Sequence, residues 1–428
     1  MTLIRSANAE CSIRFREVLG SIDAYLEFMH FFLSIRLVRP RRFVVLAFIL
    51  TSLIVTGRAL AQTAPATVSV SFGIDTTSTD VGAIVRLVRA YLAKPDSSAR
   101  SGGIWSTATD FDRRAGDLTM EAYQGFPATI ISVAPNGADD SLFVVRVLYA
   151  SADSMGRRIS PLALQRLFAV RESGSPFGFR LTGALPHLTR EWEQRTRGRV
   201  TFWYAPGQRP NPAKIAYASK FVDSVATLFQ VPPPKHLDVY VARSMEDAQR
   251  AIGLDFFPAA SADRGLGGRA LLGGIVLAGN PAYGEAYLHE IAHAILGPTF
   301  SIRNRLFGEG VATWLGGARG RTPQESYTRL RQIQTVRPSL SLKQVLSNDV
   351  PDATAEEMTD AFYATGALIV DAVYRRAGIT GLRALAQLSN DPTVLLPALP
   401  AQLGLSGSDP SALDRWWRIQ TTRISGGR

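Results

Sequence analysis

Two histidines and a glutamate stand at the spacing that zinc hydrolases use. His289 and His293 are four positions apart, so on a helix they project from one face and direct two imidazoles at one point. Glu290 follows about 100° round the helix, where it reaches a water on the metal without ligating the ion. The rest of 288–295 is mainly apolar, which predicts a buried helix, and buried histidines need a compensating partner. We therefore expect one Zn²⁺ ion rather than a helix with incidental histidines.

A catalytic zinc site needs a third protein ligand and one open position. The Gly and His of one downstream zinc-peptidase pattern are absent, because Leu296 and Thr299 occupy those positions. Glu309 is the next candidate. It lies near the start of an apolar stretch, 306–315, and a helix there, packed antiparallel to the first, brings its carboxylate to the two imidazoles. The alternative is a carboxylate that only stabilises the start of its own helix through the dipole.

Three short segments carry a family resemblance. Segments 289–293 and 308–314 resemble the gluzincin group of zinc metallopeptidases, in particular the peptidase MA-like domains, and 362–370 resembles the Tyr-x-x-Gly helix of aminopeptidase N-like enzymes. The spacing between the histidines and Glu309 is a few residues shorter than in thermolysin or aminopeptidase N, so the connection between the two helices must be tight. The resemblance covers roughly residues 198–428. It implies zinc ligands His289, His293 and Glu309, Glu290 as general base and acid, and Tyr363 as hydroxyl donor to the tetrahedral intermediate.

The alternative interpretation of Tyr363 is a buried helical tyrosine whose hydroxyl is satisfied by a local partner, which is common.

Upstream, residues 1–61 have the features of a targeting segment. A basic region ends at Arg42, an apolar run covers 43–55, and the triplet Ala-Leu-Ala at 59–61 matches the small-x-small pattern of signal-peptidase cleavage. Translation then begins at Met29, and we expect an exported, periplasmic or secreted protein. The alternative is an uncleaved anchor over 38–55, the one case in which a membrane is a partner.

The composition is that of a globular protein. Of the 428 residues 46% are apolar and 19% charged, which allows a sizeable core. The single cysteine, Cys11, falls in the predicted leader, so the remaining chain has neither a disulfide nor a thiol nucleophile. The net charge of +11 comes mainly from dispersed arginines, which favours a solvated basic surface over a nucleic-acid site. We expect a peptide or protein substrate and no nucleic acid, and the sequence leaves the oligomeric state open.

Residues 67–197 are interpreted as a separate α+β accessory domain. A helix over 80–92 precedes four strands, expected at 128–133, 142–150, 162–170 and 178–182. A helix ahead of a curved antiparallel sheet resembles the NTF2-like fold. His187, next to Pro186, is expected in a loop rather than at a metal.

Residues 198–428 are interpreted as a zincin-like peptidase domain with a small sheet and a mainly helical C-terminal part. Strand 200–204, a helix over 215–229 and strand 237–241 follow in β-α-β order. His236 opens the last of these strands and is expected to be solvated. The glycine-rich run 265–274 lacks the lysine of a phosphate loop.

Strand 275–278 comes directly before the histidine helix. The resemblance makes it an edge strand that pairs with the substrate backbone, and an interior strand is the alternative. Further helices are expected at 340–346, 356–376 and 379–388. Trp416 and Trp417 lie in a final helix as core anchors.

The sequence thus predicts an exported zinc metallopeptidase of the α+β class that hydrolyses peptide bonds. A catalytically inactive protein of the cell envelope, which uses the zinc site for binding or as a scaffold, is the alternative function. The same zinc chemistry also permits hydrolysis of a non-peptide amide. Nothing in the sequence separates an endopeptidase from an exopeptidase.

Overall fold

The computed structural model describes residues 68–93, 103–106, 126–137, 139–152, 159–257, 267–271, 273–300, 302, 304–350, 352–405 and 410–425. These residues all belong to one compact unit, Pro65–Arg428, and they form the mixture of helices and small sheets that the α+β class predicts. The predicted leader at 1–61 lies outside the described residues. Within the described ranges, no helix combines the length and the apolar character needed to cross a membrane.

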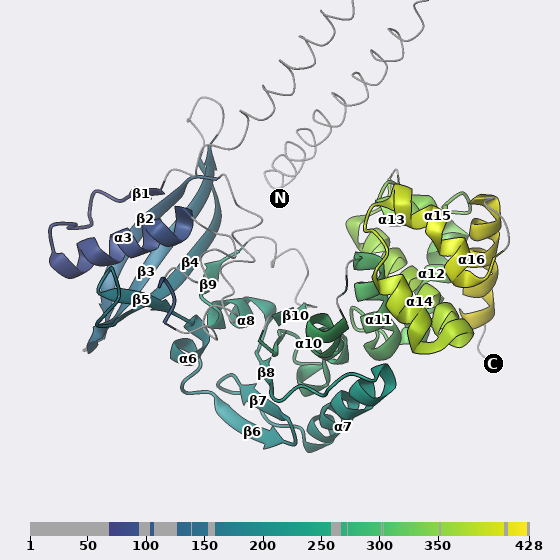
Figure 1. Ribbon diagram of the computed structural model, residues 1–428, viewed down its shortest axis with the longest axis horizontal. Helices are drawn as coiled ribbons and strands as arrows, with labels where there is room; N and C mark the ends of the chain where they lie inside the picture. The colour runs from purple at the N-terminus through teal and green to yellow at the C-terminus, as the bar shows by residue number, and fades with distance from the viewer. Residues whose placement is uncertain are drawn as a thin grey trace, which may run out of the picture. The chain divides into compact units, whose positions relative to one another are not determined.

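The first sheet follows the chain order β1-β2-β3-β4-β5, with helix α3 lying across it (Figure 1). Strand β1 is parallel to β2, and the later neighbours are antiparallel. A buried stripe at helical spacing, which includes Ile84, Leu87, Val88 and Tyr91, packs α3 on the sheet. The predicted helix and all four predicted strands are present, while the NTF2-like likeness stays a prediction. The elements are β1 (Val68–Val70), α3 (Thr79–Ala93), β2 (Ala128–Asn136), β3 (Asp139–Ala152), β4 (Ile159–Arg171) and β5 (Phe179–Thr182).

Backbone pairing crosses the predicted boundary between residues 197 and 198. Strand β6 (Glu193–Arg197) pairs with β7 (Val200–Tyr204) of the second sheet. Strand β9 (Leu254–Phe256) pairs with β4 of the first sheet. The division into an accessory domain and a peptidase domain stays a prediction. His187 lies in a short helix, α6 (Ala184–Leu188), and its ring stacks on Phe168, so the expectation of a loop was wrong.

The second sheet has the order β10-β11-β8-β7-β6. Its three central strands are parallel, and the predicted β-α-β order is confirmed by α7 (Pro212–Phe229), which connects β7 to β8 (Leu237–Val241). Alternate side chains of β8 enter different clusters. Val239 faces the cluster that includes α7, and Tyr240 faces the cluster that includes α8 (Met245–Ala251). Both faces are therefore covered, as parallel strands require.

The edge of this sheet differs from the expectation based on the resemblance. Strand β11 (Ile275–Ala278) is an interior strand between β8 and β10. The edge strand is β10 (Gly268–Leu271), which comes from the glycine-rich run and pairs antiparallel with β11. The interior alternative is thus correct for 275–278, because a further strand inserts ahead of it in the chain.

From η2 (Gly284–Ala286) onward the described chain is helical (Figure 1). The predicted break between 376 and 379 is a kink inside one long helix, at Gly378, where φ is 57°. Trp417 is fully buried and donates its indole N–H to Thr365 over 3.1 Å, which confirms it as a core anchor. The helices are α10 (Leu288–Phe300), α11 (Arg305–Gly316), α12 (Pro323–Val336), α13 (Leu342–Ser347), α14 (Ala355–Ala386), α15 (Pro392–Leu403) and α16 (Pro410–Ser425).

Candidate metal centre

Helix α10 carries both predicted histidines in its first two turns. Its apolar stripe packs against α7 and β11, which fixes the rotation of the helix about its axis. His289 is buried and His293 is half-buried on the remaining face. The predicted burial of this helix is confirmed, because the apolar residues beside the histidines are buried, among them Leu288, Ile291, Ala292 and Ile295.

Helix α11 begins at a buried cap. The side chain of Asn304 accepts a hydrogen bond from the backbone N–H of Phe307 over 2.6 Å, as an N-cap residue does. Its amide donates to the carbonyl of Leu385 in α14 over 2.7 Å. Only residues 301–304 separate α10 from α11, which is the tight connection that the spacing predicts. The cap therefore determines where the following turn, with Glu309, begins.

Two glycines bring α11 and α14 into direct backbone contact. A Cβ atom on Gly310 would lie 2.5 Å from the carbonyl carbon of Gly366, and one on Gly366 would lie 2.8 Å from the Cα of Gly310. Side chains at these positions would force the helices apart. Since Gly310 follows Glu309 and Gly366 lies one turn after Tyr363, this crossing brings both polar side chains to the histidines. The glycines in the two sequence motifs thus have a packing role.

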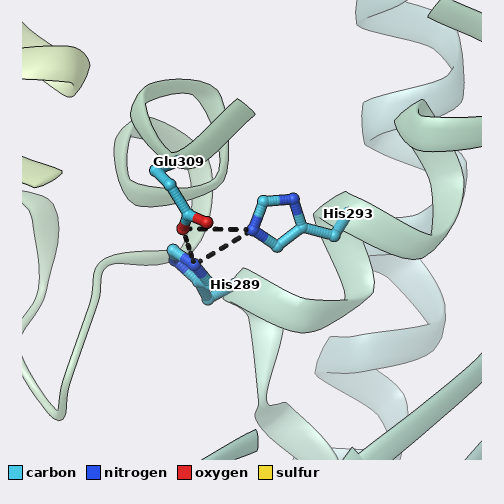
Figure 2. A group of neighbouring side chains, drawn as sticks. All are labelled: His289, His293 and Glu309. Carbon is cyan, nitrogen blue, oxygen red and sulfur yellow. Dashed lines mark hydrogen bonds and ion pairs between the residues drawn. The ribbon is translucent and has the colours of Figure 1, made fainter. Parts of the chain in front are cut away.

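Three ligand atoms converge from α10 and α11 (Figure 2). The Nε2 atoms of His289 and His293 are 3.2 Å apart. The Oε2 atom of Glu309 lies 3.3 Å from Nε2 of His289 and 3.5 Å from Nε2 of His293. Within the part of the chain that the structure describes, this is the one group of three or more His, Cys, Asp or Glu side chains whose ligand atoms converge in this way.

These separations fit a zinc ion. Ligand atoms about 2.0–2.1 Å from a tetrahedral zinc ion stand about 3.3–3.4 Å from one another. The three distances in the structure, 3.2, 3.3 and 3.5 Å, bracket that value. Two imidazole nitrogens and a carboxylate oxygen are also a donor set that zinc prefers. The residues present therefore fit one zinc ion with three protein ligands.

A backbone carbonyl sets the tautomer of His289. Its Nδ1 lies 2.8 Å from the carbonyl oxygen of Gly317. A carbonyl oxygen only accepts, so Nδ1 carries the proton and the lone pair of the neutral ring is on Nε2, which points at the other two ligand atoms. Gly316 and Gly317 make this contact possible, since a Cβ on Gly316 would lie 2.5 Å from the backbone nitrogen of His289.

Sequence analysis missed this glycine pair. The signal in the sequence was two adjacent glycines at the end of the Glu309 helix, at a position where a helix normally ends. Gly317 has a φ of 75°, which is the left-handed region that favours glycine. Its ordinary role as a helix terminator hides its second role as the acceptor for a ligand histidine.

Electrostatics in the cluster favour a cation. Burial raises the pKa of Glu309, but the hydrogen bonds to His289 and His293 outweigh burial and hold that pKa well below its usual range. Burial lowers the pKa of His289, yet the Glu309 carboxylate reverses the shift and raises it. Without a metal, the carboxylate is thus stabilised as an anion and an imidazole is favoured as a cation. A divalent ion supplies positive charge at the same place and competes with that proton.

Glu290, the predicted base, lies on α10 beside the edge strand. Its Oε2 accepts the backbone N–H of Ala270 in β10 over 2.8 Å. The neighbouring Arg269 is held partly out of water: burial lowers the pKa of its guanidinium, and the charge of Glu290 opposes that shift. Glu290 is not among the convergent ligand atoms, as the sequence predicts for a base rather than a ligand.

Tyr363 lies directly over a ligand histidine. Its ring stacks on that of His289, with centroids 5.6 Å apart and planes 13° from parallel. Burial raises the pKa of the Tyr363 hydroxyl above its ordinary value, and the nearby Glu309 carboxylate, to which it hydrogen-bonds, adds to the shift. The hydroxyl therefore stays protonated at neutral pH and remains a hydrogen-bond donor.

A cavity of about 110 Å³ connects these groups. His289, Glu290 and Tyr363 line it together with Tyr287 and with backbone from the edge strand and from residues 316–321. The structure thus brings the five predicted site residues to one place.

His236 lies outside the site. Its side chain is half-exposed and pairs with Asp238 at 2.7 Å, as expected for a solvated residue at the start of a strand.

Comparisons with known proteins give a limited likeness. No protein-family model matches the chain, and no curated protein matches it. Among solved structures, a similar chain is an M1 zinc metallopeptidase from Deinococcus radiodurans, in a mutant form bound to a Tyr-Ser-Ala substrate. The two share 15% sequence identity with a TM-score of 0.31, over 71% of this chain and 63% of the other. The match thus spans less than two thirds of that enzyme, and the functional proposal rests on the site itself.

Proposed function

We propose that this protein is a zinc metallopeptidase of the gluzincin type, which hydrolyses peptide bonds beyond the cytoplasmic membrane. The observation that carries the proposal is the convergence of His289, His293 and Glu309 at zinc-ligand spacing. A second carboxylate, Glu290, lies beside the group without joining it. That arrangement gives three ligands and a separate base, which is the pattern of a catalytic zinc site rather than a structural one.

The two imidazoles and the Glu309 carboxylate would hold one zinc ion. When it is bound, the ion supplies Lewis acidity, which lowers the pKa of water and polarises the scissile carbonyl. The Nδ1–H of His289, bonded to Gly317, keeps the Nε2 lone pair directed at the ligand position.

Glu290 moves the proton in the proposed reaction. Its carboxylate takes a proton from the attacking water at Oε2 or Oε1 and delivers it to the nitrogen of the leaving amine. The bond from the Ala270 N–H to Oε2 orients the carboxylate along the edge strand. Tyr363 donates its hydroxyl to the oxygen of the tetrahedral intermediate, because its raised pKa keeps the proton on the phenol.

The test is Glu290→Gln, which keeps the size of the side chain and removes the base. Zinc content, measured by mass spectrometry of the metal, is expected to stay at the wild-type value. Cleavage of a peptide library by the zinc-loaded protein is expected to fall by about 100-fold or more. Glu246→Gln is the matched control, because Glu246 is exposed on α8 and outside the site. A chelator should abolish cleavage in both wild type and control.

Three results would contradict the proposal. A zinc-loaded wild-type protein that cleaves no peptide points instead to the inactive binding or scaffold protein. Full activity in Glu290→Gln removes the assigned base. Zinc-independent cleavage would show that another site acts.

Tyr363→Phe tests the hydroxyl separately. We expect unchanged zinc content and a fall in kcat of about 10- to 100-fold, somewhat below the usual loss on removal of an oxyanion donor, with little change in KM. Steady-state kinetics on one cleaved peptide measure both constants. An unchanged kcat would leave Tyr363 as a packing residue over His289.

A further inference from the structure

The cavity beside the metal cluster extends to a tight turn that follows α11. Residues 318–321 form this turn, in which Ala318 and Arg321 exchange two backbone hydrogen bonds, both of 2.9 Å. The two central residues, Arg319 and Gly320, have φ angles of 49° and 84°, as in a type I′ turn. Both arginines line the cavity that His289 and Glu290 also line.

A buried carboxylate holds these arginines in place. Asp360 of α14 has a side chain that is 2% exposed and pairs with Arg321 at 2.9 Å and Arg319 at 3.3 Å. Arg329 of α12 pairs with the other carboxylate oxygen at 3.2 Å. One buried negative charge thus faces three guanidinium groups. The arginines are 17–32% exposed, so their excess positive charge is only partly screened by water.

Two further acids lie near the turn, and neither lines the cavity. Glu325 accepts the backbone N–H and the hydroxyl of Thr322 in a capping box, over 2.7 and 2.9 Å. Glu356 is half-exposed and reaches Arg319 only at 4.0 Å. Glu290 is the single acidic residue that lines the cavity. The turn therefore contributes two arginines and no acid to the lining of the cavity.

Arg321 and Tyr283 offer hydrogen-bond donors on the side of the cavity formed by the turn. A guanidinium group has five N–H donors. Within the described residues, the side-chain hydrogen bond of Arg321 runs from Nη1 to Asp360 and uses one of its nitrogens. The hydroxyl of Tyr283 lies against Gly320 of the turn, where there is no space for a Cβ. Burial raises the pKa of the Tyr283 hydroxyl, while the charge of Arg321 opposes that shift, so this hydroxyl also stays a donor.

We propose that Arg321, with the hydroxyl of Tyr283, binds a carboxylate of the peptide substrate, so that peptides with an acidic side chain or a free C-terminal carboxylate near the scissile bond are preferred. This inference rests on the proposed peptidase function. A cavity of about 110 Å³ holds several water-sized groups, at roughly 10–15 Å³ each. It therefore suits a small carboxylate-bearing group better than a large aromatic one. Asp360 orients the guanidinium, and the cavity side of Arg321 makes the charge-assisted bond.

The experiment compares kcat/KM for four peptides of one sequence. They carry Glu or Gln next to the cleaved bond, each with a free or an amidated C-terminus. The expected wild-type result is a preference of about 10- to 100-fold for one source of carboxylate, which is the range for a hydrogen bond to a charged group. The Glu and Gln pair reports on the side chain, and the acid and amide pair reports on the C-terminus.

Arg321→Gln and Arg329→Gln are the matched variants. Each removes one arginine from Asp360, but Arg329 is not among the residues that line the cavity. We expect the preference to fall to about 1 in Arg321→Gln, mainly through KM, and to keep its wild-type value in Arg329→Gln. Melting temperatures control for folding. Equal cleavage of all four peptides by the wild type, or an equal loss of preference in both variants, would overturn the inference.

Binding without turnover separates this inference from the proposed function. Calorimetry of the same four peptides with zinc-loaded Glu290→Gln, alone and combined with Arg321→Gln, should give the same ranking of affinities. If the wild type cleaves nothing but the ranking persists and depends on Arg321, the peptidase proposal fails and the carboxylate site stands. If peptides are cleaved and bound without any ranking, the carboxylate site fails and the peptidase proposal stands.

Discussion

Two clusters of charged side chains contribute residues to the lining of the cavity, and they are built in opposite ways. In the first, His289, His293 and Glu309 direct lone pairs at one point, with the ligand atoms 3.2–3.5 Å apart. In the second, the carboxylate of Asp360 is surrounded by the N–H donors of three arginines at 2.9–3.3 Å. The carboxylate of the first cluster is paired only with two imidazoles, whereas the carboxylate of the second faces three guanidinium groups that are always charged.

This difference distinguishes a metal site from a structural ion cluster. Burial of a carboxylate is common to both, so burial alone does not indicate a metal. What differs is whether the groups around the carboxylate already compensate its charge. The first cluster is complete only with a cation, and the second can take up a further anion. Each prediction below perturbs one cluster and leaves the other in place.

Removal of a ligand should have the largest effect. In wild type, zinc at about 1,000 times Kd is expected to stabilise the fold by about 4 kcal/mol, since zinc binds the folded site far better than the unfolded chain. His293→Ala should lose that stabilisation and retain less than a tenth of the bound zinc. Thermal unfolding with and without zinc measures the shift. A zinc-dependent shift that survives in His293→Ala would mean that the ion binds elsewhere.

Gly310→Ala should disturb the first cluster through packing. The added Cβ meets the backbone of Gly366 at 2.5 Å, which no side-chain rotation relieves, so we expect a loss of about 3 kcal/mol in the free energy of unfolding. Zinc affinity should fall as well, because Glu309 is the adjacent residue. Urea denaturation and a zinc titration measure the two effects.

Gly308→Ala is the matched control for that substitution on the same helix. Its Cβ would meet only the side chain of Ile302, at an ordinary 3.5 Å. We expect unchanged zinc affinity and a stability between the wild-type value and about 1 kcal/mol above it, because alanine favours the helix. Equal losses in the two variants would show that the glycine contact between α11 and α14 has no special role.

Asp360→Asn should destabilise the fold less than His293→Ala or Gly310→Ala, and it should leave the zinc content unchanged. It removes the charge that holds three arginines together. Breaking a fully buried pair costs about 3–5 kcal/mol, and we expect about 2 kcal/mol here because the arginines remain partly hydrated. Urea denaturation and metal analysis test this. A loss of bound zinc in Asp360→Asn would contradict the separation between the two clusters.

Short sequence patterns are enough to predict most residues of the candidate site. The spacing of His289 and His293 predicts a shared helix face, and the apolar residues between them predict which face is buried. The Gly-Glu-Gly and Tyr-x-x-Gly segments indicate Glu309 and Tyr363 from the sequence alone. The structure adds the reason for their glycines, which is the backbone contact between α11 and α14.

Other features could not be predicted from the sequence, because they depend on partners that are distant in the chain. The edge strand β10 was hidden in a glycine-rich run, and its strand character depends on pairing with β11. The carbonyl of Gly317 became the partner of His289 only through the contact of two helix ends. Nothing near Arg321 in the sequence indicates that Asp360 will orient it.

Residue type and short-range periodicity are enough to predict which side chains can bind a metal, which helices carry them, and where most strands and helices lie. The folded chain is needed to show which strand forms the edge, which carbonyl sets the histidine tautomer, and that two arginines of one turn line the cavity. Those features depend on contacts between residues far apart in the chain, which local periodicity does not encode.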